Sequence, residues 1–306
     1  MIDRVGLAGL AGLAGRWQRA LWAVGLALAA ATSPAQPSAG LPPGMSFVAQ
    51  DASGSWGLYA VDERRNAVHL PTQAEPRQAC VTPDGTKAVY AAADGTLRLL
   101  AAATGKEAVL ARADRQRSYT QPCLSADGRD VVVVEMMDGK SLETDILRYT
   151  SGVAEPARIA RQPGAQHDPF LYQGRWLVYA SVGCSEGCEE LLVEIWMRDL
   201  IAGQARQLTL LNALSQGPVT DGKRVVFSSN ANGTHQLWQV KLDGSGLRRL
   251  TDGLAQAVSP AICSGAVHFV RAGPSGAALA RLGDDGSVVE LPVAGLKSFR
   301  GLRCLQ

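Results

Sequence analysis

The sequence contains few of the residues on which catalytic and nucleic-acid-binding sites depend. Only 4 of its 306 residues are histidine, 19% are charged and 6% are aromatic, and 30 lysines and arginines stand against 28 aspartates and glutamates. The excess of +2 lies within the first 35 residues, so the remainder is neutral. A neutral chain lacks the basic surface that attracts nucleic acid, and we expect no nucleic-acid partner. The sequence also contains no His-Glu-x-x-His helix and no phosphate-binding glycine loop.

Long hydrophobic runs are missing too, apart from one near the N-terminus. Residues 20–31 form an apolar run of twelve, which follows basic residues and precedes Ser33 and Ala35 at the −3 and −1 positions of a cut after Ala35. This layout is typical of a secretory signal, although a cut near Ala31 and an uncleaved membrane anchor are alternatives. As a helix the run would rise about 18 Å, short of the roughly 30 Å bilayer core. We therefore expect residues 1–35 to be a signal peptide, residues 36–43 a linker, and the mature protein to be periplasmic or secreted by a bacterium, with no membrane span.

A repeat of about 45 residues runs through the rest of the chain. It is marked by turn-closing glycines that are 43, 46, 48 and 43 residues apart: Gly85, Gly128, Gly174, Gly222 and Gly265. After each glycine come a β-branched or aromatic strand, a second turn, a third strand, a third turn and a short fourth strand. The Asp-Gly and Asn-Gly turns supply the positive φ angles that tight hairpins need. An antiparallel meander of four strands cannot bury both faces alone, and radial stacking of such units as a β-propeller buries them.

The phase of the repeat predicts the number of blades and the way the ring closes. A first unit begins near Gly44, but its opening strand would fall on residues 36–43, where three prolines cannot donate to a strand ladder. The tail at residues 298–305 is in phase with an opening strand that has no continuation. We therefore predict an all-β fold over residues 44–306: a six-bladed β-propeller of four-stranded antiparallel blades, with the ring closed by the C-terminal strand.

One unit carries a family resemblance. Residues 225–251, VVFSSNANGTHQLWQVKLDGSGLRRLT, resemble the WD40-like repeat of TolB-type propellers, which runs through Phe-Ser, an Asn-Gly turn, a Leu-Trp strand, an Asp-Gly turn and Arg-Leu-Thr. The Ser-Pro-Asp-Gly element that opens such repeats is echoed at residues 82–85 and 125–128. The resemblance covers residues 44–306 and implies a six-bladed propeller and, for TolB itself, a periplasmic scaffold in the Tol–Pal system. We expect the α/β domain that precedes the TolB propeller to be absent, so Tol–Pal membership stays open.

Six cysteines, an even number, fit an oxidising compartment. The candidate disulfides are Cys80 with Cys123, Cys263 with Cys304, and Cys184 with Cys188. The first two pairs lie on opening strands of neighbouring blades, once closure makes blades six and one adjacent. The alternative for these four is that each is a small buried apolar side chain. The third pair flanks a loop of the fourth unit, where a loop-clamping disulfide is favoured over half of a metal site.

Polar residues gather just before the opening strands, at one mouth of the predicted central channel. We predict that they bind a ligand or partner, with solvation of a water-filled funnel as the alternative, and we expect their replacement to cost little stability. The candidate binding residues are Gln78, Tyr119, Gln121, Gln166, His167, Asp168, Gln216 and Arg300. The four histidines fall at four different positions of the repeat, so we expect no metal site and no cofactor.

These features favour a non-catalytic binding or scaffolding propeller of the cell envelope. Its partner would be an envelope protein or peptide segment held at the propeller face. The alternative is a polysaccharide lyase or hydrolase that works at the channel mouth, and a third interpretation is a sensor of a small molecule or metal. We assign no catalytic residue, and the fold alone does not decide among these functions.

Overall fold

The computed structural model describes residues 40–305, except 138–139, 185–190 and 275. The compact unit Ser38–Gln306 contains 24 strands, and no helix occurs among the described residues. Within this part of the chain, therefore, no helix is long and apolar enough to cross a membrane. The predicted signal peptide lies outside the described residues.

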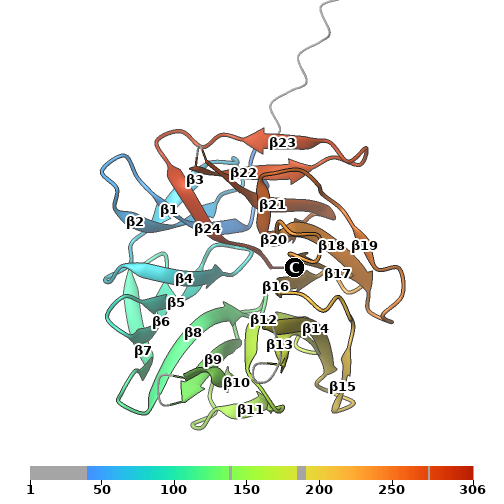
Figure 1. Cartoon of the computed structure of the whole chain (residues 1–306). Coiled ribbons are helices and arrows are strands. Elements are labelled where there is room, and N and C mark those ends of the chain that lie inside the picture. The colour runs from blue at the N-terminus through green and yellow to red at the C-terminus, as the bar shows by residue number, and fades with distance from the viewer. Residues whose placement is uncertain (1–39, 138–139, 185–190, 275, 306) are drawn as a thin grey trace, which may run out of the picture. The chain divides into compact units, whose positions relative to one another are not determined.

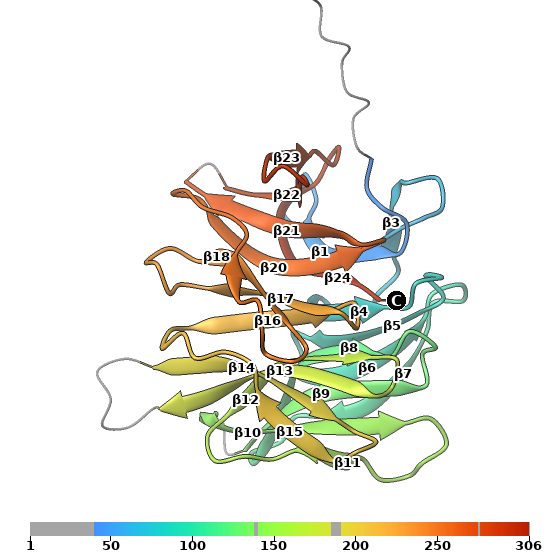
Figure 2. The same ribbon diagram turned by 90° about the vertical axis from the view of Figure 1, so that its right-hand side faces the viewer.

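The strands form six sheets of four, arranged as a ring of blades (Figures 1 and 2). Blade one consists of β24 (Lys297–Cys304), β1 (Met45–Gln50), β2 (Trp56–Val61) and β3 (Ala67–Leu70). Blade two consists of β4 (Pro76–Val81), β5 (Lys87–Ala92), β6 (Thr96–Ala101) and β7 (Lys106–Arg112). Blade three consists of β8 (Arg117–Leu124), β9 (Asp130–Met137), β10 (Lys140–Thr150) and β11 (Ala157–Ala160). Blade four consists of β12 (Gln166–Tyr172), β13 (Trp176–Cys184), β14 (Leu192–Asp199) and β15 (Gln204–Gln207). Blade five consists of β16 (Ser215–Thr220), β17 (Arg224–Ser229), β18 (Gln236–Lys241) and β19 (Arg248–Arg249). Blade six consists of β20 (Gln256–Cys263), β21 (Ala266–Gly273), β22 (Gly276–Leu282) and β23 (Val288–Leu291).

Each blade is an antiparallel meander whose first-named strand lies innermost, beside the inner strands of the two neighbouring blades. This arrangement confirms the predicted six-bladed propeller. Figure 1 shows the inner strands β24, β4, β8, β12, β16 and β20 around the middle of the ring. Residues on these strands can therefore meet at the centre although they lie some forty residues apart in the sequence.

The C-terminal strand closes the ring as predicted. Strand β24 pairs antiparallel with β1, with Cys304 opposite Met45, Arg300 opposite Val48 and Lys297 opposite Gln50. The backbone groups along the inner edge of β1 thus gain partners that the proline-rich segment before it could not supply. Blade one combines three strands from the start of the propeller with one from its end.

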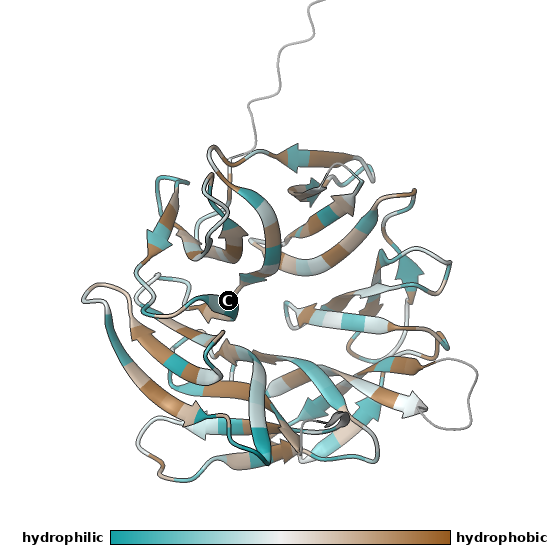
Figure 3. Ribbon diagram, turned by 60° about the vertical axis from the view of Figure 1, so that its left-hand side comes forward, coloured by the Kyte–Doolittle hydropathy of each residue, from teal (hydrophilic) through white to brown (hydrophobic). Residues whose placement is uncertain are grey.

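The core lies between the blades, where apolar residues recur along the strands (Figure 3). The largest fully buried side chains include one aromatic ring on the second strand of each of five blades: Phe47, Tyr90, Tyr179, Phe227 and Phe269. Because each of these aromatic side chains fills the space between two neighbouring sheets, removing one would leave a cavity that the surrounding strands close only in part.

Two disulfides join neighbouring blades at their inner strands. Cys80 on β4 is bonded to Cys123 on β8, with a Cα–Cα separation of 4.9 Å. Cys263 on β20 is bonded to Cys304 on β24, with a Cα–Cα separation of 5.5 Å. Both inter-blade pairs predicted from the sequence are confirmed. The third predicted pair involves Cys188, which lies outside the described residues.

Candidate functional site

The inner strands of five blades are interrupted by a bulge at one residue with a left-handed backbone. The φ angles of these residues lie between 50° and 61° for Gln121, Asp168, Gly217, Ser259 and Gly301. At each of them the strand pairing shifts register by one residue. In four of the five the next residue is proline, which cannot donate to the ladder. A bulge of this kind bends the strand and re-aims a side chain, and here it turns one residue per blade toward the central channel.

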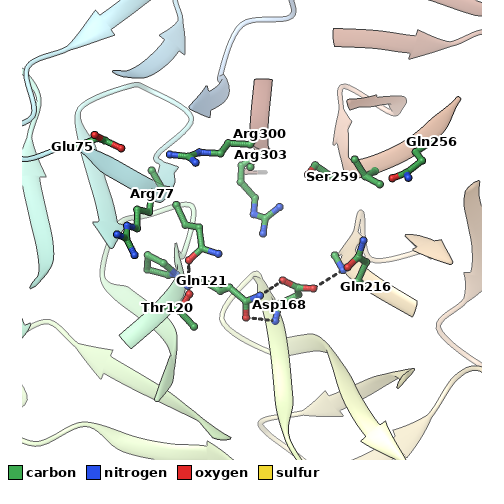
Figure 4. A pocket seen from close by; sticks show the side chains of 16 residues that line it. Glu75, Arg77, Thr120, Gln121, Asp168, Gln216, Gln256, Ser259, Arg300 and Arg303 are labelled. Atoms are coloured by element: carbon green, nitrogen blue, oxygen red, sulfur yellow. Dashed lines mark hydrogen bonds between the residues drawn. The ribbon is translucent and has the colours of Figure 1, made fainter. Parts of the chain in front are cut away.

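Three consecutive blade junctions are joined by hydrogen bonds in which a side chain of one blade accepts from the N–H of the bulge residue of the next, and we call this chain of bonds the bulge relay. The Gln78 side-chain oxygen accepts from the backbone N–H of Gln121 at 2.8 Å and from the Thr120 hydroxyl at 2.5 Å. The Gln121 side-chain oxygen accepts from the backbone N–H of Asp168 at 2.9 Å, while its amide nitrogen donates to Asp168 Oδ1 at 2.6 Å. Asp168 Oδ2 then accepts from the backbone N–H of Gly217 at 2.9 Å (Figure 4). Each side chain thus satisfies the strained backbone of the next blade.

The relay covers only half of the ring. It starts on blade two and ends on blade five, because Gly217 has no side chain with which to reach blade six. The corresponding residues of blades six and one are Ser259 and Gly301, with a short side chain and none. The channel wall is therefore cross-linked by relay hydrogen bonds from blade two to blade five. At blades six and one the relay is missing, and other side chains occupy the wall.

A cavity of about 840 Å³ opens at this level of the channel. Five of the eight predicted binding residues line it: Gln78, Gln121, Asp168, Gln216 and Arg300. The other three, Tyr119, Gln166 and His167, are not among its lining residues. Alternation along a strand would place Tyr119 with Gln121, and Gln166 with Asp168, on one face. The bulges at Gln121 and Asp168 break this alternation, so the cluster is divided between the channel and the space between blades.

The three residues that do not line the cavity lie in the blades. Gln166 is fully buried, and its amide donates to the carbonyl oxygens of Gln162 and Gly164. Tyr119 packs against the main hydrophobic core, where burial raises its pKa. His167 is half-buried and directly precedes the bulge residue of its strand.

Several lining residues were not predicted: Glu75, Arg77, Gln256, Ser259 and Arg303. The Ser259-Pro260 pair repeats the residue-proline pattern of the three preceding bulges, so that position could have been found by aligning the prolines. Arg303 could not, because it stands where the repeat calls for an apolar residue.

Two arginines of the closing strand enter the cavity with few partners. Arg300 lies 3.7 Å above the Trp56 ring and donates through Nη2 to the carbonyl of Pro76 at 3.1 Å. Arg303 donates through Nη1 to the carbonyl of Leu302 at 3.1 Å. The Nε atoms of both arginines are buried without a hydrogen-bond partner. Burial lowers the pKa of each guanidinium, although both stay charged at neutral pH because an arginine starts so far above it.

The contacts of Asp168 do not fit the expectation that rim residues cost little stability. Its carboxylate and its backbone make three hydrogen bonds to two neighbouring blades. We expect Asp168→Ala to lower the free energy of unfolding by about 2–4 kcal/mol, because it strips partners from the Gln121 amide and the Gly217 N–H. Urea unfolding measures the change. Asp168→Asn, which keeps one acceptor oxygen, is the matched control and should lose about half as much. Equal stability of the alanine variant and the parent would show that the bulge relay does not stabilise the ring.

Comparison with known proteins shows what this ring is similar to. No family model matches the chain. A stretch of 68 residues, 22% of this chain, is 32% identical to an uncharacterized protein of Agrobacterium fabrum and spans 23% of that protein. The chain therefore matches about a quarter of the length of this curated relative.

Solved structures share the propeller at low sequence identity. A putative TolB from Agrobacterium tumefaciens superimposes with a TM-score of 0.62 at 19% identity, over 83% of this chain and 90% of that one. TolB from Acinetobacter baumannii gives 0.66 at 16% identity, over 85% of this chain and 65% of that one. An oligogalacturonate lyase in complex with manganese gives 0.58 at 13% identity, over 81% and 78%. The superpositions establish a TolB-like propeller fold. Sequence identities below 20% leave the function open, since the same fold serves binding proteins and enzymes.

Proposed function

We propose that this chain is an exported, non-catalytic binding propeller that holds a segment of an envelope protein in the channel-mouth cavity. The observation that carries the proposal is the cavity itself. It is concave, it is lined by polar side chains from several blades, and it lies where the bulges of the inner strands turn those side chains toward the axis. Such a setting suits recognition of an extended chain by hydrogen bonds.

The state of Asp168 supports binding over turnover. Both carboxylate oxygens already accept hydrogen bonds, from Gln121 and from Gly217. A general base must be free to take a proton from a substrate within hydrogen-bond reach. Asp168 therefore holds neighbouring blades together. The other lining carboxylate, Glu75, is exposed and lies before β4.

Export is supported by the sequence of the first 35 residues and by the two inter-blade disulfides, because such bonds persist in oxidising compartments. A role at the bacterial envelope agrees with the likeness to two TolB propellers. The likeness to an oligogalacturonate lyase keeps an acidic-polysaccharide enzyme as the alternative.

Site-specific photo-crosslinking in the producing cell tests the proposal. A benzoylphenylalanine at Gln216 or Gln256, two exposed lining residues, should crosslink to one defined segment of an envelope protein. The same group at Gln204, an exposed residue of the outermost strand of blade four, is the matched control and should give no such product. Crosslinks at Gln204 but not at Gln216 would refute the site. Turnover of oligogalacturonate by the purified protein would replace the proposal with the enzyme alternative.

A further inference from the structure

Arg303 occupies a position that every other bulged strand fills with a buried, uncharged residue. It lies two residues after the bulge, and the strand pairing makes this position equivalent in five blades. The equivalent residues are Cys123, Phe170, Val219 and Ala261, each no more than 3% exposed. Packing in the ring therefore favours an uncharged side chain at this position. An arginine here lowers the stability of the ring, which suggests that it has a role other than packing.

The guanidinium of Arg303 has no acidic side chain in direct contact with it among the described residues. Within this part of the chain it forms no ion pair, and its one side-chain hydrogen bond goes to the adjacent Leu302 carbonyl. Asp168 attracts it through space, but both oxygens of that carboxylate accept hydrogen bonds of the bulge relay. Figure 4 shows the Arg303 side chain extending into the middle of the cavity, between Arg300 and Asp168. A half-buried cation without a direct acidic partner costs free energy that an anionic ligand would return.

The charged residues of the lining sum to one positive charge, which is that of Arg303. Arg77, Arg300 and Arg303 face the cavity against Glu75 and Asp168. Because the Asp168 carboxylate is occupied, and Glu75 is exposed at the edge, the free hydrogen-bonding groups near the axis are mainly donors. A guanidinium presents its N–H groups as a fork that matches a carboxylate.

We infer that Arg303, with Arg300 and Arg77 around it, binds a carboxylate of an acidic peptide segment in the channel-mouth cavity. This inference rests on the proposed function and names the chemistry of its partner. A peptide is favoured over an acidic sugar because no aromatic ring lines the cavity among the described residues, and the Trp56 face is covered by Arg300. Sugar-binding sites commonly offer such a face for stacking, whereas peptide recognition needs the polar donors that are present.

The test uses fluorescein-labelled hexaglutamate as the probe and hexaglutamine as the neutral comparison, measured by fluorescence anisotropy with the full mature chain. Wild type should bind hexaglutamate and leave hexaglutamine unbound. Arg303→Met keeps the length of the side chain and removes its charge, so we expect the hexaglutamate Kd to rise roughly tenfold to a hundredfold. The melting temperature of the same variant should be unchanged or higher, because a half-buried charge without an acidic partner is gone. A loss of affinity without a loss of stability is what a purely structural arginine would not give.

Two further variants keep the result clear. Arg206→Met removes an exposed arginine from the outermost strand of blade four and should leave the Kd unchanged. Arg77→Met removes an exposed lining arginine, which is safe for folding, and should weaken binding several-fold even if Arg303→Met fails to fold.

Three results would overturn the inference. They are equal hexaglutamate binding by wild type and Arg303→Met, no preference of wild type for hexaglutamate over hexaglutamine, and binding of trigalacturonate but not of hexaglutamate. If Arg303→Met binds hexaglutamate like wild type while Gln216 still crosslinks to a peptide segment, the carboxylate inference fails and the proposed function stands. If Gln216 gives no crosslink although hexaglutamate binding depends on Arg303, the proposed function fails instead.

Discussion

Deleting residues 298–306 is expected to abolish cooperative folding of the propeller. The deletion removes nearly all of β24, so the inner edge of β1 loses its ladder partner and becomes an unpaired edge that invites aggregation. It also removes Phe299 and Leu302 from the core of blade one, where Phe299 contacts the Phe47 ring at 5.4 Å between centroids. Each lost side chain costs about 2–5 kcal/mol, which together with the lost ladder approaches the 5–15 kcal/mol stability of a typical domain.

Thermal unfolding followed by circular dichroism, with light scattering for aggregation, measures this effect. The matched control replaces residues 298–306 by a shuffled sequence of the same composition, which keeps length and charge but not register. We expect the shuffled tail to behave like the deletion, and a synthetic peptide of residues 297–306 added in trans to restore part of the transition. A truncated protein that melts like its parent would show that closure through β24 contributes nothing to the ring.

Most of the ring follows from local chemistry along the chain. Turn glycines such as Gly85 and Gly128 have positive φ in the structure, as their Asp-Gly sequences predict. Closure was predictable for two reasons. The three prolines within residues 36–43 prevent that segment from forming the opening strand of the first blade, and the tail at residues 298–305 is in phase with the strand that is then missing. These are properties of one strand or one turn, and a single sequence displays them.

The site was only partly predictable because it depends on the bulges. An inserted residue reverses which side chains face the channel, so Gln121 and Asp168 line the cavity while Tyr119 and Gln166, close to them in the sequence, do not. The bulge relay connects residues 42 to 49 positions apart, and those contacts exist only after the blades have stacked. Arg303 is the clearest case, since its meaning comes from comparing its register with that of four other strands.

The last expectation concerns the two disulfides that tie blade to blade, whose loss should have the second-largest effect on stability. They close chain segments with sequence separations of 43 and 41 residues, and loops of this length correspond to about 4 kcal/mol of stabilisation each in the chain-entropy model. For a ring of this size, Cys263→Ala with Cys304→Ala should therefore lower the melting temperature by about 8–16 °C. Calorimetry of the double variant and of wild type with and without reductant measures the effect. Cys80→Ala with Cys123→Ala is the matched control: it should lose similar stability, but only the Cys263 and Cys304 pair fastens the closing strand, so only its removal should speed hydrogen exchange along β24 and β1. Identical melting of oxidised and reduced wild type would show that the blades are held by their packing alone.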